Sequence, residues 1–439
     1  MALKPDWAAY NELLEGVTAV SCHGRVNKVV GLSLEGYGFD SFIGELCDVY
    51  SKEDGSPIRA EVVGFRDDLV VLMPLGEVRG IGPGSRITGL KHKASITIGD
   101  GLLGRVIDGL ANPLDGKGPL CTGRTYPLYA QPLNPLKRTR IREPLDVGIK
   151  AINGLLTCGK GQRMGIFSGS GVGKSVLLGM IARNTTADVN VIALIGERGR
   201  EVREFIEKDL GEEGLKRSVV VVATSEQSPL VRRRGALVAT TIAEYFRDKG
   251  NDVLFMMDSI TRFAMAQREI GLAANEPPTT KGYTPSCFAM IPQLAERVGT
   301  HGEKGSITGL YTVLVDNDDL NEPISDAVRS VLDGHIVLSR DLANHHHYPA
   351  IDPLASVSRS MIDITSPDHM DCSRRLISII DTYRKAEDLI NIGAYVSGSN
   401  AQIDNAISMN DKVNKFLRQS IGERISFAET VGMMKQLCQ

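Results

Sequence analysis

The chain has 439 residues, of which 42% are hydrophobic and 23% charged, and its 50 basic and 53 acidic side chains leave a net charge of −3. This length is enough for two or three domains, and the composition is that of an ordinary globular protein. The near-neutral charge balance gives no long-range attraction to nucleic acid or to an anionic membrane. The seven cysteines are scattered without a C-x-x-C pair, which indicates reduced thiols.

The first residues, MALKPDWAAYNELLEG, lack the basic run and the apolar core of a signal peptide. No apolar run approaches the length that a membrane-spanning helix needs. We therefore expect a soluble protein of the cytoplasm.

Residues 1–16 are predicted to form a short helix. Leu3, Trp7, Tyr10 and Leu14 recur at steps of three and four residues, which puts them on one helix face. This face could pack on the body of the protein, or it could dock a partner. The only tryptophan of the chain lies in this segment, which keeps the partner-docking alternative open.

Residues 17–92 are predicted to form a β-barrel domain. Brief apolar or alternating segments (GRVNKVVG, IGELCDVYS, RAEVVGF, LVVLMPLG and GSRITGL) follow one another with glycine-rich turns between them. Closely spaced strands without a helical period are typical of a small barrel.

Residues 93–364 are predicted to form an α/β domain with a largely parallel sheet. The turn-rich segment 100–120 is interpreted as a linker. Apolar strands then alternate with helical stretches, and this alternation favours a parallel sheet covered by helices on both faces. The predicted strands are RMGIFS, VNVIALIG, SVVVVATS, DVLFMMD, ITGLYTVLV and GHIVLS.

Residues 365–439 are predicted to form a C-terminal helical domain. Ser366 is a suitable N-cap and Pro367 a suitable first helical residue. An apolar stripe that includes Leu376, Ile379 and Ile380 follows, and DNAISMNDKVNKFLRQSI carries a second one.

The segment SGSGVGKS resembles the phosphate-binding loop G-x-x-x-x-G-K-[ST], with serine at the opening position. A predicted strand precedes it and a helical pattern follows. Glycines let backbone N–H groups surround phosphate oxygens, the lysine adds a positive charge, and the last hydroxyl is suited to Mg²⁺. We expect a working site for a nucleoside triphosphate, formed by Ser168, Gly169, Ser170, Gly171, Val172, Gly173, Lys174 and Ser175.

Two acidic residues follow other predicted strands. Asp258 ends DVLFMMD and is the expected carboxylate on the Mg²⁺ shell. Glu197 follows VNVIALIG and could position or activate the attacking water, with a surface salt bridge as the alternative. An N-K-x-D segment, which would read guanine, is absent from the sequence, so ATP is the expected nucleotide.

The histidines His345, His346 and His347 are consecutive, so a regular strand cannot direct all of them at one metal ion. We interpret them as part of a loop.

Several longer segments resemble the catalytic head of the rotary ATP synthases: LIGERGREVREFIE, MMDSITRFAMAQREIGLAANEPPTTKGYTPSCFAMIPQLAERVG, DGHIVLSR and HYPAIDPLASVSRSM. They are most similar to the branch that powers protein export, the flagellar export ATPases and their type III secretion relatives. The resemblance runs from about residue 20 to the C-terminus. It implies an N-terminal β-barrel, a RecA-like P-loop nucleotide domain and a helical C-terminal domain.

The resemblance also implies roles for individual residues. Glu197 is similar to the water-activating glutamate, and Arg198 and Arg262 resemble arginines near the γ-phosphate. Tyr348 resembles the tyrosine that stacks on adenine, with Phe427 as a looser candidate beside it.

Arg359, in SVSR, resembles the arginine that one subunit inserts into its neighbour's site. One chain thus carries Lys174, Glu197 and Arg359 together. Each copy could hydrolyse ATP and complete the next site, which predicts a ring of identical chains, six by analogy with the family.

The resemblance further implies a stator-like regulator at the N-terminal helix, a stalk-like coiled coil in the ring pore, and an export gate with chaperone–cargo complexes. It places the protein at the inner face of the cell membrane. Alternatives are a virulence secretion ATPase, an ATP synthase subunit, a non-catalytic regulatory subunit and an RNA translocase. The barrel segment has few aromatics and no basic cluster, which disfavours RNA.

Overall fold

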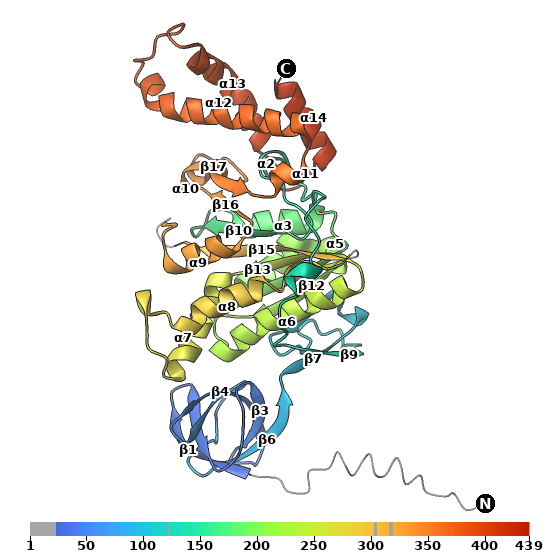
Figure 1. Cartoon of the computed structure of the whole chain (residues 1–439), viewed down its shortest axis with the longest axis vertical. Helices are drawn as coiled ribbons and strands as arrows, with labels where there is room; N and C mark the ends of the chain where they lie inside the picture. Colours follow the sequence, from blue (N-terminus) through green and yellow to red (C-terminus); the bar gives the residue numbers. More distant parts are fainter. Residues whose placement is uncertain (1–22, 122, 303–304, 316–318, 439) are drawn as a thin grey trace, which may run out of the picture. The chain divides into compact units, whose positions relative to one another are not determined.

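The computed structural model describes residues 23–121, 123–302, 305–315 and 319–438. The predicted helix at 1–16 lies outside these ranges. The described residues form two compact units (Figure 1). One unit consists of the residues up to Ala94 together with Ala273–Asn275, and the other of Ser95–Leu272 together with the residues from Glu276 onward.

The first unit is a closed barrel of antiparallel strands in the order β1-β2-β5-β4-β3-β6. Alternate residues of the strands, among them Val26, Leu34 and Leu72, fill its interior. Five of the strands were predicted; β2 was not, because SLEGY combines a charged residue and a glycine with few apolar ones. The strands are β1 (His23–Val30), β2 (Ser33–Tyr37), β3 (Glu45–Tyr50), β4 (Pro57–Arg66), β5 (Leu69–Pro74) and β6 (Arg86–Lys93).

The second unit is built on a nine-stranded sheet in the order β17-β16-β10-β15-β13-β11-β12-β8, with β14 paired to β15. All neighbours from β16 to β8 run parallel, and only β17 and β14 are antiparallel. Its strands are β8 (Arg105–Asp108), β10 (Arg163–Ser168), β11 (Val189–Ile195), β12 (Ser218–Ala223), β13 (Asp252–Asp258), β14 (Gly299–Thr300), β15 (Ser306–Leu314), β16 (Gly334–Leu338) and β17 (Ile351–Ser358).

The central strands are apolar along their whole length because both faces of the sheet are covered. Ile166, Ile192 and Met256 share one cluster with α3, while α6 packs on β11, β12 and β13. Figure 1 shows α3 and α6 on opposite sides of the strands. The predicted fold class, a β-barrel followed by a mainly parallel α/β domain and C-terminal helices, is confirmed.

The segment 100–120, predicted as a linker, contains a strand. Its residues Val106 and Ile107 are buried, and β8 extends the sheet beyond β12. Four residues between glycines are too few to show a period in the sequence. A separate two-stranded sheet joins β7 (Ser95–Ile98) and β9 (Arg124–Pro127).

The helices of the second unit connect and cover these strands. Among the described residues, no helix is both long enough and apolar enough to cross a membrane. The α-helices are α2 (Lys150–Leu155), α3 (Lys174–Asn184), α4 (Gly199–Glu204), α5 (Gly211–Lys216), α6 (Pro229–Asp248), α7 (Ile260–Ala273), α8 (Pro285–Ala295), α9 (Pro323–Val331), α10 (Arg340–Asn344), α11 (Met361–Ile364), α12 (Pro367–Asn391), α13 (Ala401–Leu417) and α14 (Phe427–Cys438).

The three C-terminal helices share a core with the sheet. The hydroxyl of Ser366 accepts a hydrogen bond from the backbone N–H of His369 at the start of α12, as the N-cap prediction requires. All three helices pack on α2, and Leu376, Phe416 and Met434 belong to the same apolar cluster as β10 and α3. Packing on α2 holds the helical region against the nucleotide-binding fold.

A buried ion pair between Glu244 of α6 and Arg297, which follows α8, generates a stability prediction. The guanidinium of Arg297 donates to both carboxylate oxygens of Glu244, at 2.8 and 2.6 Å, and both side chains are less than a tenth exposed. Removing one partner leaves a buried charge uncompensated. We expect Glu244→Ala to lower the free energy of unfolding by about 3–5 kcal/mol in denaturant titration.

The matched control is Glu207→Ala, which removes the exposed ion pair with Arg203. Its effect should stay below about 1 kcal/mol. Equal effects of the two variants would contradict this account of the core.

Candidate active site

The phosphate-loop sequence joins β10 to α3. Ser168 is the last residue of β10, and Lys174 is the first of α3. Gly171 and Gly173 have φ angles of 79° and 89°, which disfavour residues with a Cβ. The loop therefore presents the amino end of an eleven-residue helix, with its unpaired N–H groups, above the sheet.

The parallel register brings the predicted acidic residues to this same edge. Ser168 of β10 pairs with Leu314 of β15, and Met257 of β13 pairs with Tyr311 of that same strand, so β10 and β13 end at one side of the sheet. Glu197 lies two residues beyond the end of β11. Ligands of open parallel sheets bind at this carboxyl edge.

Lys174 lies between the two carboxylates. Its Nζ forms an ion pair with Oδ1 of Asp258 and lies 3.7 Å from Oε1 of Glu197. Burial acts to lower the pKa of Lys174, but the attraction of Asp258 and Glu197 outweighs it, so the pKa is raised. The lysine stays charged and ready to bind an anion.

Glu197 has an unusual protonation behaviour. Burial and the negative charge of Asp258 raise its pKa to about 7, against the opposing effect of Lys174. A hydrogen bond with Glu201 adds to this rise. A carboxyl group with a pKa near neutrality is suited to accept a proton from water.

The donor set fits Mg²⁺ bound together with a nucleotide. Asp258 is 4% exposed, and its Oδ1 also accepts a hydrogen bond of 2.7 Å from the hydroxyl of Thr312. Ser175 adds a hydroxyl at the start of α3. Hard oxygen donors of this kind, completed by phosphate oxygens and water, are what Mg²⁺ prefers. The described residues contain no group of three or more His, Cys, Asp or Glu side chains able to hold a metal ion by themselves.

Tyr348 lies at the loop. Its half-exposed ring comes within 3.4 Å of the position that a Cβ on Gly173 would occupy. Its carbonyl oxygen accepts a hydrogen bond of 2.9 Å from the backbone N–H of Gln419. Gln419 is itself buried and bonded to Lys150 and Gly148. The backbone of Tyr348 is thus held in place, while its ring stays partly exposed.

The two predicted γ-phosphate arginines differ in placement. Arg262 on α7 packs against Gly196, where an added Cβ would come within 2.8 Å of the arginine Cβ. Its Nε is buried without a hydrogen-bond partner among the described residues. Arg198 is exposed at the start of α4 and lies 3.7 Å from Glu201. Both flank Glu197.

Phe427 and Arg359 are the remaining predicted residues. Phe427 begins α14, where its N–H donates to Asp146 and its ring lies 5.6 Å from that of His369; none of its described contacts is with Tyr348. Arg359 follows β17, which runs antiparallel to β16. The first residue of β17 pairs with the end of β16, and its last residue, Ser358, pairs with Gly334 at the start of β16. Arg359 therefore lies at the opposite, amino edge of the sheet.

Sequence reasoning missed three supporting residues. Thr312 holds Asp258, Gln419 holds the backbone of Tyr348, and Glu201 shifts the pKa of Glu197. Thr312 lies inside a buried apolar strand, where one hydroxyl is a weak signal. The role of Gln419 depends on contacts across more than 70 residues of sequence.

The serine at the opening position of the loop gives a direct prediction. Ser168 has no positive φ, and its Oγ is buried without a hydrogen-bond partner among the described residues. Removing such a hydroxyl is close to neutral. We expect Ser168→Ala to keep ATP turnover within about threefold of the parent and to leave the melting temperature equal or higher.

Ser175→Ala serves as the control, because its hydroxyl is the predicted metal contact, and it should lose most turnover. A tenfold loss in Ser168→Ala would show that the serine has a part in binding.

Three family models match the chain. The nucleotide-binding domain of the ATP synthase alpha/beta family matches residues 148–358, and the beta-barrel domain of that family matches residues 28–91. The C-terminal domain of the type III secretion ATPase EscN matches residues 365–436. These matches cover all three predicted architectural parts.

Individual proteins match over nearly the whole chain. The flagellum-specific ATP synthase of Bacillus subtilis is 53% identical over 433 residues, 97% of each chain. The type 3 secretion system ATPase of Xanthomonas euvesicatoria is 49% identical over 94% of this chain and 93% of its own length.

Solved structures also match. The assembled ATPase EscN from the enteropathogenic E. coli type III secretion system superimposes with a TM-score of 0.90 at 43% identity, covering 95% of this chain and 100% of EscN. EscN in complex with its central stalk EscO gives a TM-score of 0.87 at 42% identity and the same coverage. Since the fold, the phosphate loop and the full-length relatives agree, the chain belongs to the ATP synthase alpha/beta family, in the branch of flagellum-specific ATP synthases and type III secretion ATPases that its motifs predicted.

Proposed function

We propose that this chain hydrolyses ATP as a ring of identical subunits and energises protein export through the flagellar type III apparatus. The observation that carries the proposal is the meeting of the phosphate loop, Glu197 and Asp258 at one sheet edge. It occurs in a chain 53% identical to a flagellum-specific ATP synthase.

The residues divide the chemistry among themselves. The loop N–H groups and Lys174 bind the phosphates, and Tyr348 supports the adenine beside Gly173. Bound with the nucleotide, Mg²⁺ supplies charge neutralisation next to Ser175 and Asp258. As phosphates draw Lys174 away from the carboxylates, Glu197 becomes free to accept the proton of the attacking water. Arg198 and Arg262 flank Glu197 and support charge on the γ-phosphate.

The proposed site needs an arginine that its own chain does not bring to it. The eight residues of β17 separate the level of Tyr348 from that of Arg359, about 25 Å at roughly 3.3 Å per residue. An arginine side chain does not span that distance. This separation supports a role for Arg359 in the site of a neighbouring copy, which requires an assembly, six chains by family analogy.

The remaining predictions concern partners and place. Because EscN is solved in complex with its central stalk EscO, a stalk-like coiled coil in the ring pore is the partner with the best support. A regulator at residues 1–16, an export gate with chaperone–cargo complexes, no nucleic-acid partner, and a cytoplasmic position at the inner membrane face stay predictions. So do the boundaries 17–92, 93–364 and 365–439, and adenine contact by Phe427.

The second candidate function is export through a virulence secretion system. The 49% identity to a type 3 secretion system ATPase supports this second candidate. Deleting the gene in the source cell separates the two: loss of flagellar filaments supports the flagellar function. Normal filaments with loss of another secreted set would support the alternative.

The pKa of Glu197 gives a pH prediction. The active form is the carboxylate, and its fraction rises through a pKa of about 7. We expect kcat/KM for ATP, which reports the free enzyme, to rise between about pH 6 and 8 and then level off. Glu197→Gln should nearly abolish turnover at every pH.

Glu201→Gln is the matched variant for this profile. Because Glu201 helps to raise the pKa of Glu197, its loss should move the midpoint of the rise to lower pH while the plateau is kept. An unchanged midpoint would mean that the pH dependence of kcat/KM does not come from Glu197.

The placement of Arg359 predicts how turnover depends on assembly. ATP turnover per chain should rise cooperatively with protein concentration, and Arg359→Ala should lower kcat by about 10³-fold or more without weakening nucleotide binding by its own chain. Steady-state turnover and equilibrium binding of a fluorescent nucleotide measure the two quantities.

Arg384→Ala is a suitable control. Arg384 lies on α12 and pairs with Asp352 of β17, the strand that Arg359 follows. Turnover per chain that does not change with concentration would mean that each site is complete within one chain.

A further inference from the structure

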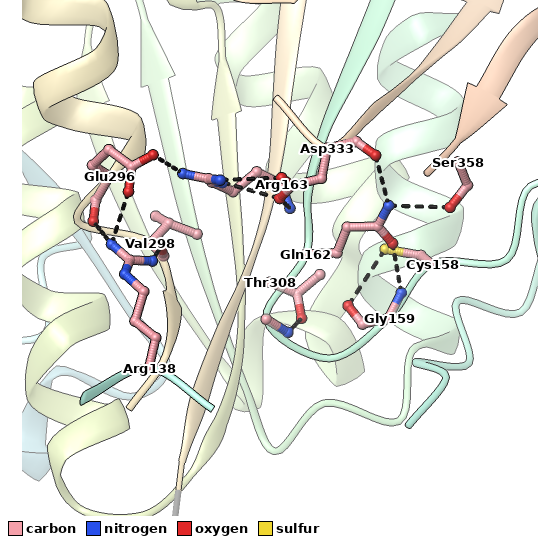
Figure 2. Close-up of polar contacts among 11 residues, drawn as sticks. Arg138, Cys158, Gly159, Gln162, Arg163, Glu296, Val298, Thr308, Asp333 and Ser358 are labelled. Atoms are coloured by element: carbon pink, nitrogen blue, oxygen red, sulfur yellow. Dashed lines mark hydrogen bonds and ion pairs between the residues drawn. The ribbon is translucent and has the colours of Figure 1, made fainter. Parts of the chain in front are cut away.

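A polar network lies at the amino edge of the sheet, where Arg359 emerges. Figure 2 shows its residues at and near the starts of several strands. Its centre is the amide of Gln162, which is fully buried. Because β17 runs antiparallel to β16, Arg359 lies away from the nucleotide site of its own chain and next to this network.

Gln162 joins three segments through one side chain. Its Oε1 accepts a hydrogen bond of 2.8 Å from the N–H of Gly159. Its Nε2 donates to the carbonyl oxygen of Asp333 and to Oγ of Ser358, each at 3.1 Å. Both donor hydrogens and the carbonyl are thus used, so the amide has one defined orientation.

Both acceptors of Gln162 adjoin Arg359. Ser358 is the residue before it, and the Ser358 hydroxyl also donates to the carbonyl of Thr157 at 2.8 Å. The carbonyl of Asp333, which receives the Gln162 amide, also accepts the backbone N–H of Arg359 at 3.0 Å. Residues 358–359 are thus held by three hydrogen bonds: Gln162 donates to the Ser358 hydroxyl, that hydroxyl donates to Thr157, and the N–H of Arg359 donates to the Asp333 carbonyl that Gln162 also contacts.

Ion pairs fix the far side of this network. The Asp333 carboxylate receives Nε and Nη2 of Arg163 at 3.0 and 3.1 Å. Arg163 also pairs with Glu296, which lies 3.1 Å from Nη2 of Arg138 (Figure 2). The carbonyl that anchors Arg359 is therefore part of a cross-linked, half-buried framework.

The side chain of Arg359 is left free by this arrangement. It is exposed, and among the described residues its guanidinium makes no hydrogen bond or ion pair. The backbone is restrained while the charged group has no partner in its own chain. A group that must act on a neighbouring subunit benefits from such pre-organisation, because less freedom is lost when it engages.

We propose that Gln162, acting through Ser358 and the Asp333 carbonyl, is a positioning residue for the Arg359 guanidinium in the site of the adjacent subunit. The inference rests on the proposed function of Arg359 in trans and deepens it. Gln162 touches neither nucleotide nor the reacting atoms, so its effect should fall on the neighbour's rate and not on nucleotide binding by its own chain.

The first test uses Gln162→Met, which keeps the length of the side chain and removes its donors, and Ser358→Ala, which removes the hydroxyl. We expect each to lower kcat for ATP by about ten- to a hundredfold and to leave KM within about twofold. The double variant should be little worse than either single one, because both break the same connection.

Thr308→Val is the matched control. The Thr308 hydroxyl accepts the N–H of Gly161 at 2.9 Å, so this variant loosens the same turn without touching Ser358 or Asp333. It should keep kcat near that of the parent even where its melting temperature falls. A loss of kcat equal to that of Gln162→Met would overturn the inference in favour of a general effect of the turn.

The second test is complementation between chains. Lys174→Ala chains lack a working site of their own but retain Arg359 and its network. In a random equal mixture with Gln162→Met chains, about a quarter of the interfaces combine an intact site with an intact arginine. Turnover of the mixture should exceed the mean of the two variants measured alone, as it should for Arg359→Ala mixed with Lys174→Ala.

The outcomes separate the two proposals. A gain for the Arg359→Ala mixture without one for Gln162→Met, or full kcat in both Gln162→Met and Ser358→Ala, overturns the positioning role alone. Full activity of Arg359→Ala, or no gain in its mixture, overturns the trans role of Arg359 and this inference with it.

Discussion

The parallel direction of the central strands is the constraint on which the rest of the structure depends. Because β10, β11 and β13 run the same way, the phosphate loop, Glu197 and Asp258 come to one edge. The edge strand β17 runs in the opposite direction, and it carries the chain from Tyr348 to Arg359 at the other edge. Each chain therefore has a nucleotide-facing edge and an arginine-bearing edge, which is the geometry that an assembly of identical subunits needs.

Electrostatics at the nucleotide-facing edge are arranged around one lysine. Lys174 lies between the buried carboxylate of Asp258 and the partly buried one of Glu197, and these two negative charges are more than it can neutralise. Burial and that excess hold the pKa of Glu197 near neutrality, while Asp258 keeps the lysine and Thr312 as partners. These different surroundings suit the two carboxylates to the different tasks proposed for them, proton acceptance and metal contact.

The arginine-bearing edge is organised by hydrogen bonds instead of charge alone. Gln162 connects a turn, the residue before β16 and the end of β17, so three distant segments determine one backbone position. The loop between α13 and α14 acts in a similar way on the other edge, where the backbone N–H of Gln419 donates to the carbonyl of Tyr348. In both places a buried glutamine holds the chain beside an exposed side chain that belongs to the proposed function.

The sequence by itself determined the family, the order of the architectural parts, most strands, and the residues of the phosphate loop with Glu197 and Asp258. Those features are local: a buried strand is a continuous apolar run, and a loop motif is contiguous. The short strands β2 and β8 were not predicted, because segments of four or five residues are too short to show a period. The tertiary structure alone decided the pKa of Glu197, the separation of Arg359 from its own site, and the roles of Thr312, Gln162 and Gln419. Each of these depends on burial or on partners distant in the chain, which no local pattern records.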